Sequence, residues 1–212
     1  MWLPRHSAPL DAELARLRGH REERNLKILD RLRSIGINIG YQEVLDEAGG
    51  ESVGRPHIAR VLQKRGIVSN FAQAFELYLG YYGAAYVPRT LLTPEEGVSL
   101  MADLGAVVSF AHPMLIRCPP SWFDEIIPRL KEAGLGAIEA YHSEHSARDE
   151  RFCVELAARY GLGLSGGSDY HGMAKPGVEL GRGKGGLRVT VALLDALKAR
   201  RKRPVDDAPE VL

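Results

Sequence analysis

The sequence contains little of what marks a secreted or membrane protein. Only two cysteines occur among 212 residues, Cys118 and Cys153, and they have neither CxxC spacing nor a disulfide-rich context. We interpret them as reduced thiols, which fits a cytoplasmic location. No apolar run approaches the roughly 18 residues of a membrane span. The N-terminus has no charged segment followed by an apolar one, so no secretion signal is predicted.

An excess of charge of either sign is also missing. Lys and Arg total 28 and Asp and Glu total 27, so the formal net charge at pH 7 is +1. This balance gives no general attraction to nucleic acid or to a membrane surface. The apolar content of 45% is ordinary for a globular protein. The length therefore predicts one domain, or one domain with an inserted subdomain.

The first half of the chain is patterned for helices. Leucines recur at helical spacing among charged residues from Leu10 to Ser34. Gly and Pro then delimit shorter helices, and Asn70 and Thr93 are plausible N-caps. The predicted shorter helices are 41–48, 55–64, 70–79 and one that starts at Thr93-Pro94.

From Ala106 onward, short apolar strands alternate with helices. This βαβαβα order predicts a parallel sheet with right-handed crossovers. We therefore expect a helical subdomain over 1–104, a strand-containing part over 105–203 and a frayed tail over 204–212. The predicted strands are 106–111, 137–141 and 162–166, and the predicted helices are 121–133 with Ser121 as cap, 146–160 and 191–203.

Metal-binding side chains follow two of these strands. His112 follows the first strand, and Asp169 and His171 follow the third. Catalytic and metal-binding groups collect at such strand ends in α/β folds. In an extended segment, Asp169 and His171 would point to the same side. Carboxylate and imidazole together suit a divalent ion such as zinc or manganese.

Each of these patterns also has a simpler interpretation. His112 could be a hydrogen-bonded strand-end histidine, and the following Pro113 predicts an extended conformation for it. Asp169 could cap a glycine-rich turn. Glu139, on the second strand, could orient a ligand histidine or pair with an arginine. Arg55 and His57 could be an exposed arginine and a histidine at a helix start.

Four motifs occur in a fixed order: GRPHIA at 54–59, AHP at 111–113, GAIEAY at 136–141 and GGSDYHG at 166–172. Together they resemble the PHP family, named for polymerase and histidinol phosphatase domains, which are metal-dependent phosphoesterases. The likeness runs from roughly Leu10 to Gly181. It is greatest to the branch that hydrolyses nucleoside 3',5'-bisphosphates and short oligoribonucleotides.

The resemblance implies an α/β fold that is an incomplete, distorted (β/α)7 barrel with a helical insertion. It implies that His112, Asp169 and His171 each serve one of up to three divalent ions, which could be manganese, zinc or iron. Arg55 and His57 would contact the substrate, a small phosphorylated nucleotide or short RNA. Glu139 and His145 would contact the metal-ligating side chains and hold them in position.

The sequence departs from the family at one point. Family members open with a His-x-His strand and further ligands, and no His-x-His occurs here. The chain resembles the C-terminal two-thirds of the enzyme. We expect either an active phosphoesterase whose start is misplaced, or an inactive fragment or nucleotide-binding module. An oligomer or a complementing N-terminal segment could complete such a fragment.

Overall fold

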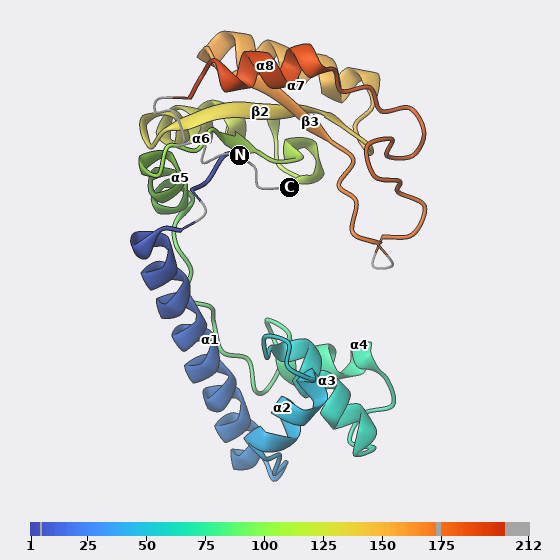
Figure 1. The fold of residues 1–212 in the computed structure, drawn as a ribbon. Coiled ribbons are helices and arrows are strands. Elements are labelled where there is room, and N and C mark those ends of the chain that lie inside the picture. The colour runs from blue at the N-terminus through green and yellow to red at the C-terminus, as the bar shows by residue number, and fades with distance from the viewer. Residues whose placement is uncertain (5, 173–174, 202–212) are drawn as a thin grey trace, which may run out of the picture. The chain divides into compact units, whose positions relative to one another are not determined.

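The computed structural model describes residues 1–4, 6–172 and 175–201, which form two compact units (Figure 1). One unit is Ala8–Leu91, and the other combines Met1–Ser7 with the described part of Leu92–Leu212. The expected boundary near residue 105 differs from this division, which groups the helix after Thr93 with the strands. The tail expected at 204–212 lies outside the described residues.

The helical unit contains α1 (Ala8–Ser34), α2 (Tyr41–Ala48), α3 (Arg55–Lys64), α4 (Phe71–Ala74) and the π-helix η1 (Phe75–Leu79). The bounds of α2 and α3 are those predicted from their glycines and proline. The Asn70 side chain accepts the hydrogen bond of Gln73 N and caps α4. The single helix predicted at 70–79 is wrong in its second half, because Gly80 N donates to Phe75 O at 2.7 Å and widens the turn.

Aliphatic side chains form the core of the helical unit. Ile28 and Leu32 of α1 are fully buried against Ile58 and Leu62 of α3 and against Leu79. The N-terminal part of α1 carries polar residues. Further along the helix Asn25 is buried, and its Nδ2 donates a hydrogen bond to Val53 O at 3.1 Å. Hydrogen bonds to the loops therefore supplement the apolar packing of this long helix.

The second unit contains β1 (Val108–Phe110), β2 (Leu135–His142) and β3 (Gly163–Gly167). The strands pair in the order β1-β2-β3 and are all parallel, as the alternating pattern predicted. Among the described residues this sheet has three strands, and the incomplete (β/α)7 barrel stays a prediction. The helices of this unit are α5 (Pro94–Asp103), the 3-10 turn η2 (Pro113–Leu115), α6 (Pro120–Glu132), α7 (Ala147–Tyr160) and α8 (Val191–Lys198).

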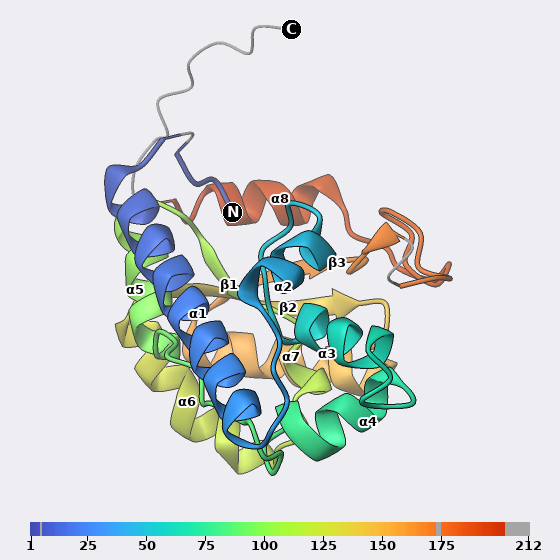
Figure 2. The ribbon, with the colours of Figure 1, turned by 90° about the horizontal axis from the view of Figure 1, so that it is seen from below.

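The sheet lies between two layers of helix. Phe123 of α6 and Leu156 of α7 pack with Ile138 on one face. Leu197 of α8 packs with Ala137 on the other face, and Figure 2 shows α8 and the α6–α7 pair on opposite sides. Because the three strands are parallel, their carboxyl ends lie at one edge of the sheet.

Three predicted boundaries in this unit are wrong for identifiable reasons. Ser121 is not the cap of α6, which begins at Pro120, a residue without an N–H that would need capping. The strand predicted from Ala106 begins at Val108, because Ala106 N donates to Met101 O and Val107 pairs with Met1. Helix α8 ends at Lys198 rather than at 203. No described helix is long and apolar enough to cross a membrane.

Close approach of β2 and β3 makes Gly166 difficult to replace. A Cβ at Gly166 would lie 2.8 Å from both Cβ and O of Tyr141. We expect Gly166→Ala to lower the free energy of unfolding by about 1–3 kcal/mol, because the strands must separate. Gly19→Ala, on α1 with nothing within 4 Å, is the control and should stabilise by about 0.5–1 kcal/mol. Urea unfolding of both variants checks this, and equal effects would contradict it.

The two free thiols should differ in reactivity. Burial raises the pKa of Cys153 to about 12, whereas Cys118 is only half-buried. A raised pKa keeps Cys153 protonated at pH 8, and the thiolate is the reactive form. We expect a disulfide reagent to label one thiol per native chain and the second only on unfolding. Cys118→Ser should abolish labelling of the native chain. Labelling that persists in this variant would contradict the prediction that Cys118 is the reactive thiol.

Candidate functional site

Three polar side chains meet where the parallel strands end. His112 lies two residues beyond β1, His142 is the last residue of β2, and Asp169 lies two residues beyond β3. The ring centroids of His112 and His142 are 5.6 Å apart. His142 Nε2 lies 3.6 Å from Asp169 Oδ2. The sheet therefore gathers two residues predicted from the sequence around His142, which lies just outside the predicted strand 137–141.

The backbone is strained at two predicted site residues. His112 has φ 31° and ψ 55°, and Asp169 has φ 54°, both in the left-handed region. The extended conformation predicted for His112 before Pro113 is therefore wrong. Its N–H donates to Glu139 Oε2 at 2.6 Å, and Pro113 opens the η2 turn, which together hold this conformation. Strain of this kind concentrates at functional sites.

Two histidine rings are held by a hydrogen bond from Nδ1 to a backbone carbonyl, which leaves the lone pair on Nε2. His145 Nδ1 lies 2.8 Å from Ala140 O, and His171 Nδ1 lies 2.9 Å from Asp169 O. A carbonyl oxygen only accepts, so each Nδ1 carries the proton and each neutral ring keeps a lone pair on Nε2. This is the tautomer that ligates metals through Nε2. His145 Nε2 is buried and has no hydrogen-bond partner among the described residues.

His142 is arranged in the opposite way. The backbone N–H of Glu144 donates to His142 Nδ1 at 3.1 Å, so Nε2 carries the proton in the neutral ring. Burial lowers the pKa of His142, although the charges of Glu139 and Asp169 oppose this effect. His142 Nε2 is therefore buried near Asp169 Oδ2, but at 3.6 Å it makes no hydrogen bond among the described residues. The sequence signal that could have located it is the spacing: His142 follows the apolar Ile138 and Ala140 at alternate positions, which lie on one side of a strand, and all three are buried.

Lysine side chains neutralise the carboxylates of this site. Lys175 Nζ donates to Asp169 Oδ2 at 2.6 Å and lies 3.1 Å from Glu144 Oε1. The hydrogen bond from Lys175 lowers the pKa of Asp169. Asp169 and His171 do lie together, with Oδ1 and Nδ1 3.4 Å apart. Asp169 has a left-handed backbone, so the extended segment expected there is not formed.

The donor chemistry of the site suits a divalent cation only in part. Orphaned imidazole nitrogens and a carboxylate at a strained position are what such an ion requires. In the part of the chain that the structure describes, no three His, Cys, Asp or Glu residues are grouped so that they could hold an ion. The described residues therefore furnish single donors rather than a complete coordination shell.

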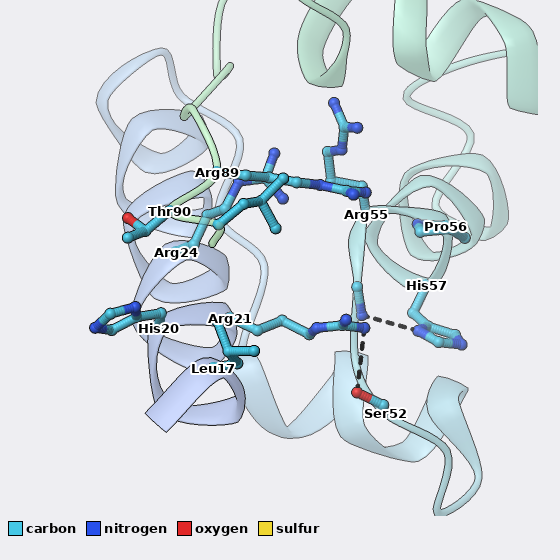
Figure 3. Close-up of a pocket in the computed structure, with 12 residues that line it drawn as sticks. Leu17, His20, Arg21, Arg24, Ser52, Arg55, Pro56, His57, Arg89 and Thr90 are labelled. Atoms are coloured by element: carbon cyan, nitrogen blue, oxygen red, sulfur yellow. Dashed lines mark hydrogen bonds between the residues drawn. The ribbon is translucent and has the colours of Figure 1, made fainter. Parts of the chain in front are cut away.

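The other predicted residues line a cavity in the helical unit. Arg55 and His57, at the start of α3, border a cavity of about 310 Å³ (Figure 3). Arg55 Nη1 donates to Leu79 O at 2.8 Å, and its guanidinium lies 5.5 Å from the Phe75 ring centroid. His57 Nδ1 accepts from Gly54 N at 3.1 Å, which leaves Nε2–H as a donor.

Three arginines of this cavity were missed in the sequence analysis. Arg21 and Arg24 come from α1, and Arg89 comes from the segment that leaves the unit. Figure 3 shows Arg21 extending from α1 toward Ser52, which its Nη1 reaches at 3.3 Å. The spacing of Arg21 and Arg24 places them on one side of a helix, but nothing in the sequence connects them with Arg89.

Sequence comparison identifies relatives that act on phosphate esters. No family model matches the chain. The chain is 30% identical over 175 residues to the 5'-3' exoribonuclease Rnm of Escherichia coli, covering 82% of this chain and 59% of that protein. It is 28% identical over 186 residues to the 3',5'-nucleoside bisphosphate phosphatase of Chromobacterium violaceum, covering 84% and 65%. The chain thus spans less than two thirds of the length of these curated relatives.

Structural comparison agrees with the sequence comparison. The fold matches a crystal structure from Bifidobacterium adolescentis, described as that of a metal-dependent phosphoesterase, with a TM-score of 0.68. Sequence identity is 26%, and the match covers 95% of this chain and 70% of that one. Both comparisons confirm the resemblance to the PHP family that the motifs predicted: the chain is similar in sequence and in fold to phosphoesterases.

Proposed function

We propose that this chain forms part of a metal-dependent phosphoesterase that acts on small nucleotides. The substrate would be a nucleoside 3',5'-bisphosphate or the 5' end of a short RNA. The observation that carries the proposal is the gathering of His112, His142 and Asp169 at the carboxyl ends of three parallel strands. The activities named for the Escherichia coli and Chromobacterium relatives support the substrate class.

His112, Asp169 and His171 are the residues that we assign to metal binding. Their imidazole and carboxylate donors suit manganese, zinc or iron, and other donors would complete the usual three or four. A divalent ion held there would stabilise charge on the phosphoryl oxygens and lower the pKa of an attacking water.

Other residues of the chain would position these ligands. Glu139 accepts the His112 N–H and so holds the left-handed backbone from which the imidazole projects. Ala140 O fixes the His145 ring and leaves its Nε2 lone pair available. A buried, neutral His142 would donate to Asp169 and orient its carboxylate. Such supporting contacts commonly determine how firmly a metal is held.

Arg55 and His57 would bind a phosphate of the substrate. A guanidinium matches two phosphate oxygens at once. The acceptor bond at His57 Nδ1 leaves Nε2–H as a donor, and the nearest carboxylate oxygen, Glu51 Oε2, lies 3.7 Å from Nε2. The packing of Arg55 against Phe75 and Leu79 O limits the freedom of its side chain. Less side-chain entropy is then lost when the phosphate binds.

A second candidate is nucleotide binding without hydrolysis. It is favoured by the lack of any three-donor metal group among the described residues. The arginine-lined cavity requires no metal in order to attract an anion. The first candidate predicts that the chain hydrolyses the nucleotide, whereas the second predicts binding without hydrolysis.

Removal of the Asp169 carboxylate tests the first candidate. We expect chain 1–212 with Mn²⁺ to release phosphate from adenosine 3',5'-bisphosphate. Asp169→Asn should lower kcat/KM by more than about 100-fold, since even loss of a residue that supports a metal ligand costs about 10–100-fold. Asp195→Asn, at an exposed position of α8, is the matched control and should change little.

Metal analysis separates the two candidates if turnover is absent. Folded wild-type chain should carry two or three ions after dialysis against Mn²⁺. A folded chain that holds no ion and releases no phosphate would count against hydrolysis by this chain. That result would favour nucleotide binding alone.

A further inference from the structure

We propose that the cavity of the helical unit is an anion site in its own right, which binds a phosphate group through Arg24 and its neighbours without any metal ion. The relevance of this site to catalysis rests on the function proposed above, but the binding itself does not. The ligand class is a phosphate monoester, carried by a nucleotide or present as inorganic phosphate.

Arg24 provides the first argument, because it is a charged side chain that lines the cavity while being 8% exposed. Its Nε donates to Val87 O at 2.8 Å, which fixes the plane of the guanidinium. Its Nη2 is buried and makes no hydrogen bond among the described residues. A buried cation with an unmet donor is costly, and native proteins usually pair such groups.

The surrounding charges provide the second argument. Burial lowers the pKa of Arg24, and the positive charges of Arg55, Arg89 and Arg21 lower it further. These guanidinium groups belong to α1, α3 and the segment after Val87, so the fold itself brings them together. No acidic residue is among the described residues that line the cavity. A bound anion would replace this repulsion by attraction.

The shape of the donors provides the third argument. Arginine presents a planar fork that matches two oxygens of a phosphate, and several forks can contact different oxygens. A phosphate monoester carries nearly two negative charges at neutral pH, whereas a single carboxylate carries one. The cavity of about 310 Å³ lies in the size range of small-ligand sites. A phosphate therefore fits both the charge and the available space.

The test is calorimetric titration of chain 1–212 in EDTA, with inorganic phosphate, adenosine 5'-monophosphate and acetate as separate probes. Phosphate and the nucleotide should bind, and acetate should bind more weakly than either. Equal affinity for the two phosphates would identify phosphate as the recognised group. Tighter nucleotide binding would add a contribution from the nucleoside, and both results support the site.

Three variants locate the binding. Arg24→Gln should weaken binding by about tenfold or more, since a lost charged hydrogen bond is worth that factor. Arg89→Gln should weaken it by about threefold to tenfold, and Arg89 is exposed, so this variant tests the site even if Arg24→Gln unfolds. Arg18→Gln, exposed on α1 and outside the cavity, should bind as the wild type does.

The proposal is overturned if folded wild-type chain binds neither phosphate probe, or if Arg18→Gln weakens binding as much as Arg89→Gln does. Binding in EDTA by a chain that hydrolyses nothing would support this site and count only against the proposed function. Hydrolysis with Mn²⁺ by a chain that binds no phosphate in EDTA would support the proposed function and count against this site.

Discussion

Parallel hydrogen bonding of β2 to both neighbours is the constraint on which the strand-end site depends. Ile138 is paired with Phe110 on one side and with Leu164 on the other, so the three strands cannot slide independently. An irregularity between Glu139 and Tyr141 shifts the register just before the strand ends. Glu139 then reaches the backbone of His112, while His142 turns into the protein beside Asp169. A bulge at this position re-aims side chains at a functional edge.

Much of the fold was predictable because local signals agreed with the final structure. Gly49 adopts a left-handed conformation after α2, and Thr93 forms a capping box with Glu96 at the start of α5. Two predicted elements were wrong for different reasons. The beginning of β1 depends on a distant partner, because Val107 N donates to Met1 O. The π-turn depends on a local bond from Gly80 N to Phe75 O, which the apolar spacing of a helix does not distinguish from ordinary α-helical bonding.

Some residues of the candidate site were predictable from local sequence, and others depend on tertiary contacts. His112 and Asp169 were predictable because each follows an apolar strand. The left-handed conformation of His112 was not predictable, because a tertiary contact with Glu139 overrules the preference of a residue before proline. The cluster of Arg24 with Arg89 was hidden for another reason. The two residues are far apart in sequence, and each alone has the pattern of an ordinary surface arginine.

Lys175 would compete with any metal ion for the carboxylate oxygens of Asp169 and Glu144. Its ammonium group already contacts Asp169 and Glu144, and the tether through the intervening chain keeps its effective concentration high. A cation that binds Asp169 Oδ2 must displace the Lys175 ammonium group, so its apparent affinity is an exchange constant rather than an intrinsic affinity. The net charge of the region then changes by less than the full charge of the ion. Mobile monovalent salts would compete poorly for the same oxygens, because the resident cation is part of the chain itself.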